Sequence, residues 1–147
     1  EGNAYEMTVI VSADKIPQTL EIELLRSPNG EEKTVVTFMK CVGGDYAVLP
    51  DTKDSLLMIN AEKSSVNTSV RVLPPDVTSV VKDEKEALKL QIFVDKSSVE
   101  VFANDKCCAF ARAYPERTDS IGIAMKARGA DTVIKSVEYN KVGTIYN

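Results

Sequence analysis

The stretch "LQIFVDKSSVEVFAND", from Leu90 to Asp105, decides the fold. Apolar residues alternate with other residues on both sides of a short polar break, as in two strands joined by a turn. The positions that share the apolar face are Leu88, Leu90, Ile92 and Val94 before the break, and Val99, Val101 and Ala103 after it. The pattern predicts a β-hairpin, which the strand at Cys107–Tyr114 extends into a three-stranded meander.

Two carboxylates, Asp95 and Glu100, flank the break in this hairpin. A glycosidase pair needs carboxyls about 5–5.5 Å apart for retention or about 6.5–9.5 Å for inversion, with a sugar pocket between them. Closeness in sequence does not create such a pocket, so we favour a structural role. Asp95, Ser97 and Ser98 are expected to accept backbone N–H bonds in the turn, and Glu100 to face solvent or a basic neighbour.

The same period of two recurs along most of the chain. Further strands are expected at 4–12, 19–25, 33–39, 46–49, 55–62, 120–127 and 132–142. Turn signals are Asn29-Gly30 and Gly43-Gly44-Asp45. Residues 63–83 are expected to form a loop with at most a short strand or helical turn, and the only candidate helix is 76–89. About ten short strands predict an all-β chain. We expect one domain, 1–147, built as an antiparallel two-sheet β-sandwich of the jelly-roll or concanavalin-like kind, with little or no helix.

Composition excludes several classes of function. The net charge of −4 gives no basic surface for nucleic acid or an anionic membrane, and no apolar run is long enough to span one. The chain has no His, and its three cysteines, Cys41 and the Cys107-Cys108 pair, fit neither a disulfide ladder nor a zinc site. We therefore expect no catalytic residue, no cofactor and no metal ligand in this chain. The compartment stays open.

The stretch from about Leu88 to Pro115 resembles the signature of the C-terminal β-sandwich domain of glycoside hydrolase family 32, the invertases, levanases, inulinases and related β-fructofuranosidases. That family reads L-x-I-F-V-D-x-S-S-V-E-V-F-x-N-D-G and then a strand ending in Y-P. Lys106 stands where Gly is usual, which implies a different turn there. The residues that carry the resemblance form a structural signature: Asp95, Ser97, Ser98, Glu100, Phe102, Asn104, Asp105, Tyr114 and Pro115.

The resemblance implies that catalysis belongs to a separate N-terminal five-bladed propeller. Its motifs W-x-N-D-P-N-G, R-D-P and E-C are missing from this chain. The segment "RSPNG", Arg26 to Gly30, shares Pro-Asn-Gly with the first motif, but Ser27 occupies the place of the nucleophile. A serine cannot replace that carboxylate. The implied partner is the propeller of the same parent chain.

Four functions stay open. The first is a structural module that packs against the propeller, with a homodimer as an addition. The second is a carbohydrate-binding module for fructans or other glycans, although the aromatic residues Tyr5, Phe93, Phe102, Phe110 and Tyr114 are expected in the core more than on a sugar platform. The third is an unrelated adhesin-like or immunoglobulin-like sandwich, and the fourth an autonomous hydrolase.

Overall fold

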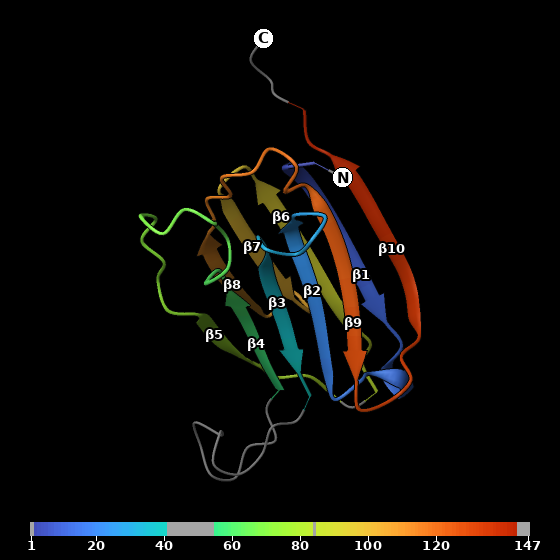
Figure 1. Ribbon diagram of the computed structural model, residues 1–147. Helices are drawn as coiled ribbons and strands as arrows, with labels where there is room; N and C mark the ends of the chain where they lie inside the picture. The colour runs from blue at the N-terminus through green and yellow to red at the C-terminus, as the bar shows by residue number, and fades with distance from the viewer. Residues whose placement is uncertain (1, 41–54, 84, 144–147) are drawn as a thin grey trace.

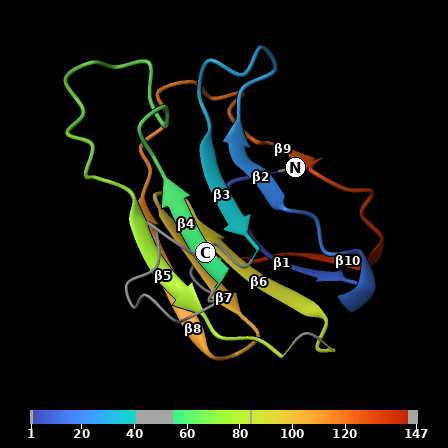
Figure 2. The same ribbon diagram turned by 90° about the horizontal axis from the view of Figure 1, so that it is seen from below.

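The computed structural model describes residues 2–40, 55–83 and 85–143, which form a two-layer β-sandwich (Figures 1 and 2). One sheet has the order β10-β1-β6-β7-β8 and the other β5-β4-β3-β2-β9, and every pairing is antiparallel. The first sheet comprises β10 (Ile134–Lys141), β1 (Ala4–Val11), β6 (Leu88–Asp95), β7 (Ser98–Ala103) and β8 (Cys107–Arg112). The second comprises β5 (Asp76–Val80), β4 (Ser55–Asn60), β3 (Thr34–Met39), β2 (Thr19–Arg26) and β9 (Gly122–Arg128). The predicted fold class is confirmed.

The alternation in the sequence produces the two layers. In β1 and β6 every second residue is buried, so both strands direct an apolar row at the opposite sheet. Removing these rows from water is the main force that holds the layers together. Alternation is interrupted at Leu25, whose φ is 47° and where the pairing of β2 with β9 shifts register. Leu24 and Leu25 are therefore both buried.

The predicted meander is β6, β7 and β8. Lys96, with φ 52°, lies in the two-residue turn between β6 and β7. Between β7 and β8, Asn104 and Asp105 have φ of 51° and 56°, and Lys106 N donates to Ala103 O at 3.0 Å. Two successive left-handed residues are typical of a type I′ turn. Lys106 stands where the family usually has Gly, but the left-handed residues of this turn are Asn104 and Asp105, so Lys106 itself does not need the left-handed conformation.

Two other expectations are settled in the same region of the chain. The candidate helix over residues 76–89 is wrong, because β5 pairs with β4 and β6 begins at Leu88. β5 is the one short strand expected between residues 63 and 83. Within the described residues the only helical element is the 3₁₀ turn Ala13–Lys15. The predicted strand at 46–49, the turn at 43–45 and Cys41 lie outside the described residues.

The expected core position of the aromatic residues is largely wrong. Of the five aromatic residues named above, only Tyr5 is fully buried, while Phe93 and Phe102 are half-buried on the outer face of their sheet with ring centroids 5.9 Å apart. Phe110 is 40% exposed and Tyr114 is 47% exposed. Phe93, Phe102 and Phe110 occupy the outward positions of their strands, where alternation directs a side chain away from the core whatever its polarity.

Candidate functional site

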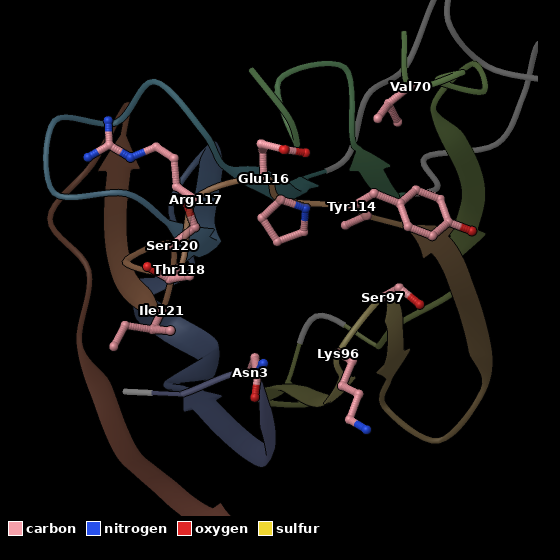
Figure 3. Close-up of a pocket in the computed structure, with 12 residues that line it drawn as sticks. Asn3, Val70, Lys96, Ser97, Tyr114, Glu116, Arg117, Thr118, Ser120 and Ile121 are labelled. Carbon is pink, nitrogen blue, oxygen red and sulfur yellow. The ribbon is translucent and has the colours of Figure 1, made fainter. Parts of the chain in front are cut away.

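A cavity of about 400 Å³ opens where several loops meet at one end of the sandwich (Figure 3). Its walls come from Asn3, the turn Lys96-Ser97, Val70 and the connection between β8 and β9. The part of that connection that lines the cavity is Ala113–Thr118, Ser120 and Ile121. Figure 3 shows the exposed ring of Tyr114 beside Val70, with Lys96, Ser97 and Asn3 across the opening. The cavity thus gathers three signature residues, Ser97, Tyr114 and Pro115.

Backbone hydrogen bonds hold the rim of this cavity. Lys96 N donates to Asn3 O at 2.6 Å, Ala113 N to Ser97 O at 2.9 Å and Gly2 N to Ile121 O at 3.1 Å. These bonds join the N-terminal segment, the β6–β7 turn and the β8–β9 connection. The rim is therefore built from backbone of three separate segments and is independent of their surface side chains.

A buried carboxylate, Glu32, holds the wall of the cavity from inside. Its Oε1 accepts from Val66 N and Glu116 N, both at 2.9 Å. Its Oε2 accepts from Arg117 N at 3.1 Å and from Ser120 Oγ at 2.5 Å. Glu32 is fully buried, and within the described residues no cation pairs with it. One side chain thus links the β2–β3 turn to two loops far away in sequence.

The protonation of Glu32 follows from these contacts. Burial acts to raise the pKa of its carboxyl, but the hydrogen bonds from Ser120, Val66, Glu116 and Arg117 outweigh burial and hold the pKa below its ordinary value. Glu32 is therefore an ionised acceptor with its hydrogen-bonding capacity in use. Our sequence analysis missed it, because its partners lie 34 to 88 residues away.

A second cavity of about 420 Å³ lies along the outer edge of β8. Its lining is mostly apolar and comprises Ile59, Ala61, Leu73, Pro74, Pro75, Asp76, Phe110, Ala111 and Arg112. Phe110 N donates to Asp76 Oδ2 at 2.8 Å, and the Arg112 guanidinium lies 5.6 Å from the centre of the Phe110 ring. The Asp76 bond satisfies a free N–H of an edge strand and ties β8 to β5 in the other sheet. The two cavities are neighbours, because Tyr114 follows Arg112 by two residues.

A third hollow of about 330 Å³ lies on the outer face of the other sheet and contains Glu23. Alternation places Glu23 on the solvent side, yet it is only 1% exposed, since long cationic side chains cover it. Its carboxylate accepts from Arg26 Nε at 2.6 Å, Lys33 Nζ at 2.7 Å and Lys126 Nζ at 2.8 Å. Burial acts to raise the pKa of Glu23, but these hydrogen bonds and charges lower it to about 2. Because all three cations are bound, we treat this cluster as structural.

The remaining signature residues do not converge on a cavity. Asp95 is exposed, and within the described residues no hydrogen bond reaches its carboxylate, so the expected role in the turn is not seen there. Glu100 and Phe102 point outward from β7, and Ser98 pairs with Asp95 across the hairpin. Asn104, in the β7–β8 turn, instead bonds across to the start of β6: its Oδ1 accepts from Lys89 N and its Nδ2 donates to Ala87 O, both at 2.8 Å.

Neither Asp95 nor Glu100 lines any of the three cavities described above. Across the same part of the chain, no group of three His, Cys, Asp or Glu side chains is placed to bind a metal ion. Burial raises the pKa of the Cys107 and Cys108 thiols, which disfavours the reactive thiolate. No helix among the described residues has the length and apolar character that a membrane span requires.

Three solved structures resemble this chain over nearly its whole length. Exo-inulinase from Aspergillus awamori superposes with a TM-score of 0.73 at 21% identity, over 97% of this chain and 26% of that one. Fructan 1-exohydrolase IIa from Cichorium intybus superposes with a TM-score of 0.73 at 14% identity, over 94% of this chain and 30% of that one. Sucrose-6-phosphate hydrolase from Lactobacillus gasseri superposes with a TM-score of 0.61 at 22% identity, over 89% of this chain and 24% of that one. These likenesses show a shared fold, and this chain spans less than a third of each of those proteins.

No curated protein matches the chain. A profile of the family described as "Glycosyl hydrolases family 32 C terminal" matches residues 1–141, which include the three cavities, the meander and Glu32. The chain therefore belongs to the C-terminal domain family of the family 32 glycosyl hydrolases.

Proposed function

We propose that this chain is the non-catalytic C-terminal module of a fructoside-cleaving enzyme, and that it stabilises the catalytic domain by packing against it. The observation that carries the proposal is the family match over residues 1–141. The similar structures include an inulinase, a fructan exohydrolase and a sucrose-phosphate hydrolase, which favours sucrose or a fructan as the substrate of the parent enzyme. Bond cleavage is assigned to the catalytic domain of the parent chain.

The chemistry of the described residues supports a structural role. The two buried carboxylates, Glu23 and Glu32, are fully occupied by hydrogen bonds from this chain and have lowered pKa values. A general acid in a glycosidase needs a raised pKa and contact with the substrate. Asp95 and Glu100 are in outward positions on an open sheet face, where no enclosed site could position a sugar between them.

Two measurements test this proposal. The purified chain should show no turnover of sucrose, levan or inulin. Deletion of this domain from the parent enzyme should shorten the half-life of its activity on heating, because the apolar surface that the module covers would be exposed to water. Hydrolysis by the isolated chain would contradict the assignment, as would a deletion that leaves heat inactivation unchanged.

A second candidate function is carbohydrate binding, which the unexpected exposure of Phe110 and Tyr114 favours. Exposed aromatic rings beside hydrogen-bonding groups suit the C–H faces and hydroxyls of a sugar. Titration of the chain with levan, inulin and short fructo-oligosaccharides tests this function. Saturable binding that is lost on Phe110→Ala or Tyr114→Ala would support it, and no binding of any of these sugars would exclude it for fructans. A homodimer stays a separate proposal, which sedimentation velocity of the chain would test.

A further inference from the structure

We infer that one face of the module, the side on which the two loop cavities open, is the surface that docks onto the catalytic domain. We define this docking face by the two cavities, by the exposed side chains of Leu73, Phe110 and Tyr114 that line them, and by the exposed Val66 and Val72 of the β4–β5 connection. The inference rests on the proposed function and adds to it the place of contact.

The docking face gathers apolar side chains from the β4–β5 connection and from one continuous segment, whose residues 110–112 line the second cavity and 113–114 the first. Val70 and Tyr114 line the first cavity, while Leu73 and Phe110 line the second. Figures 1 and 2 show the loop after β4 on the same side of the sandwich as β5 and β8. Leu73 is 62% exposed, which is the highest exposed fraction among the five side chains that define the docking face. Exposed apolar groups gathered in this way mark interaction sites.

The docking face is also preorganised. Asp76 holds β8 against β5 through Phe110 N, and Asn67 Nδ2 donates to Glu116 Oε2 at 3.4 Å. Glu32 fixes Val66, Glu116 and Arg117 from below through their backbone N–H groups. A surface whose loops are ordered before binding loses less conformational entropy on association.

The position of the rest of the parent chain selects the occupant. The matched family is described as C-terminal, and the similar structures extend to more than three times the length of this domain. On the proposed function, the catalytic domain is therefore joined through the N-terminal side of the module. Gly2 is bonded to Ile121 and Asn3 to Lys96, so that side of the chain lies at the rim of the first cavity. A domain connected there is adjacent to the docking face.

The charges around the docking face suit the rim of a protein interface. Arg117 is bound on the module itself, by Asp119 at 2.7 Å and Glu31 at 3.0 Å. Arg112 stacks on Phe110 and donates to Ser97 Oγ at 3.4 Å. The centre is thus apolar and aromatic, while the charged groups lie around it, which is the usual arrangement at interfaces between domains.

The opposite side of the sandwich supplies a matched control. Val133, Ile134 and Val137, at and before β10, are also exposed apolar side chains. We compare the double variant Leu73→Asp/Tyr114→Asp with the control Val133→Asp/Val137→Asp, both in the full parent enzyme. The four side chains are between 47% and 62% exposed, so neither variant removes core packing from the module.

The docking variant should shorten the half-life of activity on heating by about tenfold or more, because large side chains at the centre of an interface carry most of its energy. The control variant should match the wild type. A second measurement needs no variant: oxidative footprinting of the wild-type parent should find Tyr114 protected and Val137 reactive.

The outcomes separate the two proposals. If only the control variant shortens the half-life of activity and Tyr114 is oxidised in the footprint, the catalytic domain docks at the β10 side. That result overturns this inference and leaves the proposed function intact. If neither variant has an effect and deletion of the whole module is also harmless, both the inference and the proposed function are overturned. If the docking variant alone is harmful and Tyr114 is protected, both stand.

Discussion

Replacement of Glu32 by Gln tests whether a single buried carboxylate holds the wall of the first cavity. Gln has the shape of Glu but offers one acceptor oxygen, and its NH₂ group cannot accept. The most favourable orientation turns the NH₂ toward Oε2, because the Ser120 hydroxyl can rotate and become an acceptor. Arg117 N–H then has no acceptor, while Val66 N and Glu116 N keep a neutral one.

The cost of Glu32→Gln can be worked out from these contacts. A buried N–H without a partner costs about 1–3 kcal/mol, and each hydrogen bond to a charged group loses roughly 1 kcal/mol when that group becomes neutral. With two bonds weakened and one lost, we expect a decrease of at least about 3 kcal/mol in the free energy of unfolding, the lower end of that sum. For a domain of this size that corresponds to about 6–12 °C in melting temperature.

Thermal and urea unfolding at pH 7, followed by circular dichroism, would measure the effect. The matched control is Glu31→Gln, one residue earlier, where the carboxylate is 58% exposed and pairs with Arg117 at 3.0 Å. An exposed pair of this kind contributes at most about 1 kcal/mol. Equal melting temperatures for the two variants would refute the assignment of Glu32 as the link between the loops.

Three further predictions concern other residues. Asp105→Gly should stabilise the domain by about 0.5 kcal/mol in urea unfolding, because relief of a left-handed conformation, about 1–2 kcal/mol, exceeds the cost of the extra freedom of Gly in the unfolded chain, about 0.5–1 kcal/mol, and Asn104-Gly is the preferred type I′ pair; a loss of stability would contradict the turn assignment. The pKa of Glu23 is lowered from 4.5 to about 2, so its contribution to the free energy of unfolding is fully present above pH 4.5 and is lost as the pH falls toward 2. Glu23→Gln should therefore flatten the pH dependence of the unfolding free energy between pH 4.5 and 2, and an unchanged slope would contradict the stabilising role of the Glu23 cluster. Asp95→Ala should change stability by less than about 0.5 kcal/mol, as expected of an exposed side chain, and a larger loss in the urea midpoint would restore the turn role that we first predicted.

The elements that depend on local pattern were predictable. The strands β1, β2 and β6 to β8, the meander and the turn at Asn104-Asp105 follow from alternation and turn chemistry within short windows. The helix suggested for residues 76–89 was wrong because the pairing of β5 with β4 outweighs a weak helical pattern. That pairing joins separate segments, so no short window of the sequence contains it.

The cavities depend on contacts between distant segments. Glu23 looked like a solvent-facing residue of a strand, and only the approach of Lys33 and Lys126 shows that it is covered. The same holds for Glu32, whose acceptor role depends on a loop and on a connection that lie far along the chain. Neither arrangement has a local signal.

The sequence by itself determined the all-β class, the paired strands and the family likeness, because side-chain alternation and turn residues act over a few positions. Tertiary structure alone decided which polar residues are buried, which aromatic rings stay exposed and where the loops enclose a cavity. The physical reason is that burial and hydrogen bonding depend on which segments meet in space, and the stacking of two sheets brings together residues that are far apart in the chain.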